Sequence, residues 1–365
     1  MANEILDLPR TKEIPPERKG IVWLNRKAHI KYSGTDKATH WGISGISGKG
    51  KTYSAIIISC QYDNVWFFDP KGGVDKVVRE QGGKVGSGKE WEYWYFGRRK
   101  GVTKEKRMLI NASEIDTRCI NTLIEGELIG KQQKISMLIS KWDALPIEKK
   151  TYEELKELFK ENKLEYMFED ISQILDDSDQ APSIELYTMG RKIIDIIGIP
   201  KNSKALGLLV SIMFWKRSPT DLEMLVAFDE ANSYFGKKNT PVAKVLTDIY
   251  TQGRSYKIHG LWMAQNFGAL AKDVKLNTTI NILMDNQVTD RFCLQFDVPK
   301  EYLDDVFDVV IPDSMLGGAF FHAPLFKTMG DPMFKIIQMS NYYRELIESV
   351  EVVVGLKDFL PTPYL

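Results

Sequence analysis

Residues 45–52 read Gly-Ile-Ser-Gly-Lys-Gly-Lys-Thr and match the pattern G-x-x-x-x-G-K-[ST], which constrains this chain more than any other feature. The glycines let backbone N–H groups turn inward around a phosphate, while the helix that follows presents the favourable end of its dipole to the anion. The motif therefore needs a strand before it and a helix after it. The apolar runs 40–44 and 52–60 supply both. The sequence predicts a phosphate-binding loop between a strand and a helix.

The residues of this loop have separate predicted roles. Lys51 is expected to reach the β- and γ-phosphate oxygens, and the Thr52 hydroxyl is expected to bind Mg²⁺. A near-match at 83–90 ends in Glu90, whose charge would repel phosphates, so we interpret it as an ordinary loop rich in glycine and lysine. The predicted cofactors are ATP and Mg²⁺. The predicted nucleotide-binding residues are Gly45, Ile46, Ser47, Gly48, Lys49, Gly50, Lys51 and Thr52.

The apolar run 224–228 ends in two acids, Asp229 and Glu230. In proteins with such a loop, an aspartate at this place holds Mg²⁺, commonly through water, and a following glutamate is positioned to deprotonate the attacking water. Many strands end in acids, so this motif alone is weak evidence for a metal site. It becomes informative because the phosphate-binding loop at 45–52 precedes it in the same chain. A glutamate beside the metal-binding aspartate is typical of ATP-driven motors, which makes a motor the leading class. The predicted metal ligands are Thr52 and Asp229.

Two polar residues further along the chain are candidates for the same site. Gln265 follows the apolar run 260–264, where an amide would lie near the γ-phosphate and report its loss. Arg254 follows an apolar helical face that ends at Gly253. Each has an equally weighted alternative, Gln265 as a loop amide and Arg254 as a solvated cation at a helix end. The predicted catalytic residues are Lys51, Glu230, Arg254 and Gln265.

From residue 39 onward, short apolar runs alternate with helical patterns, which predicts an α/β fold with a mainly parallel sheet and flanking helices, of the RecA-like type. Between 115 and 204 the strand signal gives way to charged stretches with helical periodicity, as at 152–175. We expect a helical subdomain inserted there. The expected strands are 40–44, 65–68, 108–111, 224–228, 260–264, 280–284 and 319–322. The expected divisions are an N-terminal segment 1–36, a core of 37–114 and 205–345, a helical insertion 115–204 and a tail 346–365.

Composition excludes several classes of protein. The 49 basic and 49 acidic residues give a formal net charge of zero, so the molecule as a whole does not attract a polyanion and nucleic acid would need a local patch. Three widely separated cysteines indicate a reducing compartment and not a disulfide framework. The chain start lacks the pattern of a secretion signal, and its longest apolar run, 205–215, is too short to span a bilayer. We expect a cytoplasmic protein without a membrane anchor.

The densest mixture of aromatic and basic residues lies at 91–107. Bases stack on aromatic rings and lysine or arginine neutralises phosphates, so the aromatic run 91–96 followed by Arg98, Arg99 and Lys100 is a candidate for contact with DNA. The alternative, which we favour, is a strand with core-facing rings and a solvated basic turn. Lys237 and Lys238 are a second, weaker candidate for contact with DNA.

Together these motifs resemble the HerA/FtsK superfamily of hexameric DNA-pumping ATPases, closest to its HerA branch. The resemblance spans roughly 40–325 in the order found in the family. The N-terminal barrel domain of cellular HerA proteins has no counterpart in the 36 residues before the core of this chain. The insertion at 115–204 is larger than the resemblance leads us to expect. The matching segments are the loop at 45–52, Phe67-Phe68-Asp69-Pro70-Lys71-Gly72, Phe228-Asp229-Glu230-Ala231-Asn232, Gln252-Gly253-Arg254-Ser255-Tyr256, Ala264-Gln265 and the glycine turn within 312–322.

The resemblance implies a Mg²⁺-dependent ATPase that translocates or packages DNA, with double-stranded DNA as the expected track. It also implies a homo-oligomer, expected to be a hexameric ring, in which Arg254 acts on the pocket of a neighbouring subunit. A nuclease, a portal or a transfer complex would be the partner of such a motor. The alternatives are a regulatory nucleotide-binding switch and a conjugative transfer ATPase that depends on a partner and does not itself translocate DNA.

Overall fold

The computed structural model describes residues 21–23, 29–31, 40–124, 127–199, 204–216, 223–235, 241–284, 318–322, 334–338 and 354–355. The N-terminal segment 1–36 and the tail 346–365 fall almost wholly outside these residues. Lys237, Lys238 and the first part of the glycine turn, 312–317, fall outside them as well. Among the described helices, none has the length and apolar character needed to cross a membrane.

The central element is an eleven-stranded sheet with the order β13-β12-β11-β10-β3-β9-β8-β4-β7-β5-β6. From β10 to β6 all neighbours run parallel, and β11, β12 and β13 extend the sheet in antiparallel fashion. The predicted α/β fold with a mainly parallel sheet is confirmed. The strands are β3 (Trp41–Gly45), β4 (Asn64–Asp69), β5 (Trp91–Phe96), β6 (Arg107–Met108), β7 (Arg191–Asp195), β8 (Met224–Phe228), β9 (Ile258–Ala264), β10 (Ile280–Met284), β11 (Gly318–His322), β12 (Phe334–Gln338) and β13 (Val354–Gly355), with a separate hairpin of β1 (Ile21–Trp23) and β2 (His29–Lys31).

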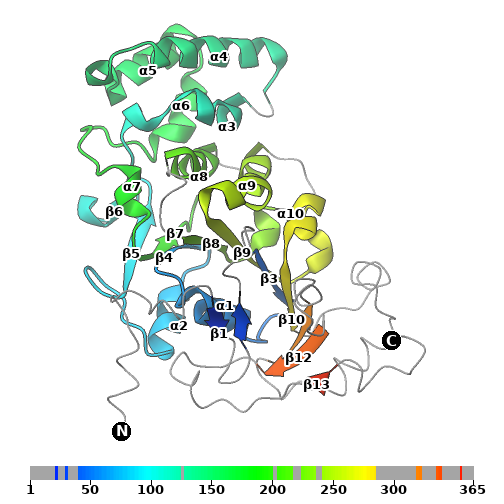
Figure 1. Ribbon diagram of the computed structural model, residues 1–365. Helices are drawn as coiled ribbons and strands as arrows, with labels where there is room; N and C mark the ends of the chain where they lie inside the picture. The colour runs from blue at the N-terminus through cyan, green and yellow to red at the C-terminus, as the bar shows by residue number, and fades with distance from the viewer. Residues whose placement is uncertain are drawn as a thin grey trace.

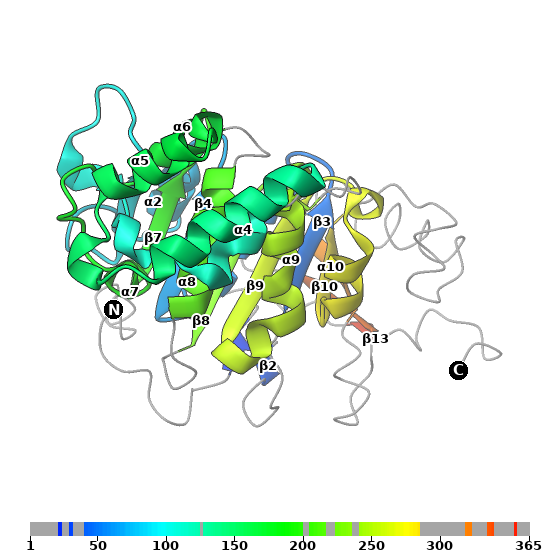
Figure 2. The ribbon, with the colours of Figure 1, turned by 90° about the horizontal axis from the view of Figure 1, so that it is seen from above.

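Helices cover both faces of the sheet (Figures 1 and 2). Alternate residues of β4 face opposite ways, so Val65 and Phe67 pack in the core beneath α1, whereas Trp66 and Phe68 pack in the larger core on the other face. The first face carries α1 (Lys51–Ser59) and α2 (Val74–Glu80). The second carries α3 (Ile120–Ile124), α4 (Ile129–Asp143), α5 (Tyr152–Glu161), α6 (Glu165–Ser172), α7 (Ile184–Tyr187), α8 (Lys204–Lys216), α9 (Pro241–Gln252) and α10 (Lys272–Asn277).

The inserted helices are not a separate globule. Leu155 of α5 and Ile171 of α6 belong to the same continuous core as Leu206 of α8 and Trp66 of the sheet. In Figure 1, α3 to α6 form an outer layer above α8 and α9. The helical insertion therefore thickens one face of the sheet and leaves the opposite face to α1 and α2.

Strand β7 corrects the expectation that 115–204 contains no strand. It lies in the middle of the parallel sheet, between β4 and β5, and all five of its residues are buried. The first two residues of the strand are the cations Arg191 and Lys192, which leave an apolar run too short to be recognised as a strand in the sequence. Their charges are compensated on neighbouring segments, Arg191 by Glu90 at 3.8 Å and Lys192 by Glu92 at 3.3 Å. We keep the division into core and insertion as a proposal, with the insertion ending before Arg191.

Candidate nucleotide-binding site

The loop at 45–52 leaves the carboxyl end of β3 and enters α1 at Lys51, as its motif requires. Gly48 and Gly50 adopt φ values of 86° and 89°, in the left-handed region that glycine occupies without strain. No side chain caps α1, so the first N–H groups of the helix remain directed toward the loop. Gly45 is required for another reason, since a Cβ there would lie 1.9 Å from the carbonyl oxygen of Met284. This geometry suits a phosphate.

Lys51 lies across its own loop. Its Nζ donates hydrogen bonds to the carbonyl oxygens of Gly45 and Ile46, each at 2.8 Å. Burial lowers the pKa of Lys51, although the charges of Asp229 and Glu230 act in the opposite direction. The lysine is thus a cation between the phosphate loop and two acids.

Asp229 and Glu230 follow β8 at the same edge of the sheet, because β8 and β3 both pair in parallel with β9. The Oδ1 atom of Asp229 accepts a hydrogen bond from the Glu230 N–H at 2.8 Å. Burial raises the pKa of Asp229 and so disfavours its charged form, whereas a nearby cation such as Lys71 favours it. A half-buried carboxylate of this kind, with the Thr52 hydroxyl and phosphate oxygens, fits Mg²⁺, which takes few protein ligands when it binds with a nucleotide.

Glu230 has an unusual backbone. Its φ of 52° and ψ of 41° place a non-glycine residue in the left-handed region, which turns the chain sharply after β8. Such conformations cost on the order of 1 kcal/mol and are concentrated at functional sites. The turn brings the Glu230 side chain to two donors, Lys71 and Gln265.

Gln265 lies directly after β9 and its Nε2 donates to Oε1 of Glu230 at 3.1 Å. The structure therefore brings Gln265 into the site with Lys51, Asp229 and Glu230. Its contact with a γ-phosphate stays a prediction.

Lys71 is a residue of the site that sequence reasoning missed. Its Nζ lies 2.5 Å from Oε1 of Glu230, with the hydrogen bond and opposite charge of Glu230 raising the pKa of Lys71. The same contact lowers the pKa of Glu230, outweighing the effect of burial. The available signal was the motif Asp69-Pro70-Lys71-Gly72, which follows β4 and therefore ends at the same sheet edge.

Arg254 does not join this cluster within one chain. It is an exposed residue of the short 3-10 turn Gly253–Tyr256, which precedes β9, whereas Gln265 follows β9. The seven residues of β9 separate the two by roughly 20 Å at about 3.3 Å per residue. Arg254 thus lies at the opposite edge of the sheet from Lys51.

The aromatic run 91–96 forms strand β5, as in the alternative that we favoured, and its rings at Trp91 and Phe96 are buried. The basic turn after it differs from that alternative, because its arginines are ion-paired and not simply solvated. Arg98 pairs with Asp177 at 2.9 Å, and Arg99 pairs with the buried Asp195 at 2.7 Å. Arg99 also lies over the ring of Tyr95, 5.2 Å from its centroid. Both arginines therefore have an acidic partner within the protein.

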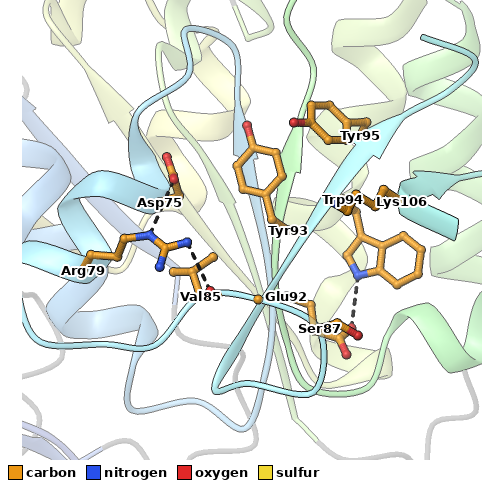
Figure 3. A pocket seen from close by; sticks show the side chains of 10 residues that line it. Asp75, Arg79, Val85, Ser87, Glu92, Tyr93, Trp94, Tyr95 and Lys106 are labelled. Atoms are coloured by element: carbon orange, nitrogen blue, oxygen red, sulfur yellow. Dashed lines mark hydrogen bonds and ion pairs between the residues drawn. The ribbon is translucent and has the colours of Figure 1, made fainter. Parts of the chain in front are cut away.

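A pocket of about 420 Å³ lies beside β5 (Figure 3). Tyr93 and Tyr95 of β5 face it together with Asp75 and Arg79 of α2, which form an ion pair at 3.8 Å. Strands β9, β8, β4 and β7 separate β5 from β3, so this pocket is distinct from the phosphate loop.

No family model and no curated protein matches this sequence. Among solved structures, VirB4 of Thermoanaerobacter pseudethanolicus is similar, with a TM-score of 0.56 and 15% identity over 88% of this chain and 96% of that one. The bacterial conjugative coupling protein TrwB aligns with a TM-score of 0.46 and 12% identity over 78% of this chain and 82% of that one. The genome packaging NTPase B204 of Sulfolobus turreted icosahedral virus 2 aligns with a TM-score of 0.36 and 10% identity over 83% of this chain and 97% of that one. The likeness to VirB4 confirms the RecA-like fold that the HerA/FtsK resemblance predicts.

Proposed function

We propose that this protein is a Mg²⁺-dependent ATPase that moves or packages DNA. The observation that carries the proposal is the meeting of four segments at one sheet edge. Lys51 of the phosphate loop, Asp229 and Glu230 after β8, Lys71 after β4 and Gln265 after β9 all lie there. A nucleotide bound to this loop would have its terminal phosphate next to two acids and two lysines.

The proposed reaction is attack of water on the γ-phosphorus, with breakage of the bond to the β–γ bridging oxygen. Glu230 takes the proton of the water, and the products are ADP and inorganic phosphate. Lys51 and the loop N–H groups hold the phosphate charge. Thr52 and Asp229 would hold Mg²⁺, which would supply positive charge to the β- and γ-phosphate oxygens.

The ring rests on the HerA/FtsK resemblance, and the position of Arg254 limits the role that this residue takes in it. An arginine about 20 Å from its own pocket acts on a nucleotide only if another subunit brings a pocket to it. We therefore propose a homo-oligomer, a hexamer by the HerA/FtsK resemblance, in which Arg254 neutralises γ-phosphate charge across the interface. Double-stranded DNA as the track rests on the resemblance alone, and the zero net charge requires a local surface for it.

The test is the ATP turnover of the purified protein with and without long duplex DNA, measured beside its mass in solution. The wild-type protein should hydrolyse ATP with Mg²⁺, and duplex DNA should raise the rate. Lys51→Ala should abolish turnover, whereas Lys76→Ala, on the exposed side of α2, should not change it. ATP turnover that DNA does not affect would replace the motor with a nucleotide-dependent switch, and full activity of Lys51→Ala would refute the site.

A further inference from the structure

The contact between Lys71 and Glu230 joins two segments that are 159 residues apart in the chain. Both donors that reach Glu230, the ammonium of Lys71 and the amide of Gln265, use the same oxygen, Oε1. A carboxylate oxygen engaged in this way, with a cation at 2.5 Å, is a weaker proton acceptor than a free one. While this contact holds, Glu230 is therefore restrained as a base.

The backbone of Lys71 is fixed, but its side chain is not enclosed. Asp69 accepts hydrogen bonds from the N–H groups of Lys71, Gly72 and Val74, at 3.2, 2.8 and 3.0 Å. These bonds hold the loop between β4 and the first residue of α2 in place. The Lys71 side chain is nevertheless 59% exposed, so the ammonium is free to change partners without any movement of the backbone.

Lys71 is also within electrostatic range of the place where phosphates would lie. Its charge acts on Lys51, the lysine of the phosphate loop, and on Asp229, the acid next to Glu230. A triphosphate bound to the loop brings more negative charge to this point than the single carboxylate of Glu230. A diphosphate lacks the charge of the γ-phosphate, which in the proposed site would be the part closest to Glu230.

We propose that Lys71 is the residue by which this pocket distinguishes a nucleoside triphosphate from a diphosphate. It holds Glu230 in the empty and diphosphate-bound pocket, and it moves to the γ-phosphate when a triphosphate binds, which frees Glu230. Lys71 thus contacts Glu230 in one state of the pocket and the nucleotide in the other. This inference rests on the proposed nucleotide site but not on DNA translocation.

The first experiment follows the contact itself. A water-soluble carbodiimide joins an amine to a carboxylate in contact with it, and peptide mass spectrometry identifies the product. The nucleotide-free protein and the protein saturated with ADP and Mg²⁺ should both give the Lys71–Glu230 cross-link. Saturation with adenylyl imidodiphosphate and Mg²⁺ should remove most of it. An undiminished cross-link with the triphosphate analogue would overturn the proposal.

The second experiment measures selectivity without hydrolysis. Calorimetric titration gives the ratio of the affinities for adenylyl imidodiphosphate and ADP, each with Mg²⁺. Lys71→Met should lower this ratio by about two- to five-fold, the range expected for a half-exposed ion pair. Lys71→Arg keeps the charge and should retain the wild-type ratio. Lys76→Met, on the exposed side of α2, is the matched control and should also retain it.

An unchanged ratio in Lys71→Met, with a wild-type protein that binds both nucleotides, would refute the role of Lys71 and leave the proposed ATPase intact. A wild-type protein that binds neither nucleotide would refute the nucleotide site and this inference together. Circular dichroism of each variant shows whether the fold is retained, as the exposure of both lysine side chains predicts.

Discussion

Gln265 donates a hydrogen bond of 3.1 Å to Glu230, and each residue lies just beyond the carboxyl end of its strand. Strands β8 and β9 are parallel neighbours in register, with Phe228 opposite Trp262. Their ends therefore deliver the two side chains to one point, although 35 residues separate them in the chain. This relation places an amide beside the proposed base.

We expect Glu230→Gln to bind ATP with nearly unchanged affinity and to hydrolyse it at least about 100-fold more slowly. An amide keeps the shape of the side chain but does not take a proton from water, and general-base catalysis typically contributes this much or more. Single-turnover rates and nucleotide titration measure the two quantities. A loss of affinity with little loss of turnover would assign Glu230 to binding only.

Arg254 is expected to act across a subunit boundary. Arg254→Ala and Lys51→Ala should each be inactive alone, but a mixture should recover part of the ATPase activity at interfaces that combine an intact Lys51 with an intact Arg254. Native mass spectrometry verifies that mixed rings form. If mixed rings form and stay inactive, Arg254 has a different role, such as stabilising the end of α9.

Arg99→Ala should destabilise the fold. Asp195 is almost fully buried, with 3% of its side chain exposed, and loss of Arg99 leaves Tyr93 as its side-chain donor at 2.8 Å. Removing one partner of a buried carboxylate costs about 1–3 kcal/mol. Urea denaturation measures the loss, and the exposed Lys100→Ala is the matched control.

The same contacts change what we expect of the basic turn. A triple replacement of Arg98, Arg99 and Lys100 by alanine would weaken DNA binding and flatten its salt dependence if the turn contacted phosphates. The ion pairs of Arg98 and Arg99 predict that the salt dependence is retained. A flatter dependence in a folded triple variant would restore the turn as a DNA contact.

Acid should destabilise this protein partly through His40. Burial, together with the charge of His259, lowers the pKa of His40 to about 3, and its Nδ1 accepts a hydrogen bond from the Gly260 N–H at 2.9 Å. The unfolded chain binds a proton at this residue below about pH 6.5, whereas the folded chain does not until about pH 3. Stability should therefore fall by up to about 1.4 kcal/mol per pH unit between these values.

His40→Asn offers an amide oxygen to the same N–H without a titratable group. The variant should show a shallower loss of stability than the wild type as the pH falls from 6.5 to 4. Urea denaturation at several pH values measures the difference between the two proteins. Parallel curves would show that His40 is not the group responsible.

The phosphate loop and the general fold were predictable from local patterns. The motif at 45–52 contains its own strand, turn and helix start, and the strands 224–228 and 280–284 were predicted with their observed bounds, since both are short apolar runs flanked by polar residues. The sequence also allowed the prediction that one site contains Asp229, Glu230 and Gln265, because the carboxyl ends of parallel strands meet at one edge of a sheet.

The amino-acid sequence by itself therefore determined the phosphate loop, the class of fold and most of the residues at the sheet edge, because each depends on residues close together in the chain. Tertiary structure alone decided the rest. Strand β7 is buried despite Arg191 and Lys192 because Glu90 and Glu92 neutralise them from neighbouring segments. Lys71 meets Glu230 only because β4 and β8 are adjacent. Charges paired across distant segments leave no local pattern, since their compensation exists only once the chain has folded.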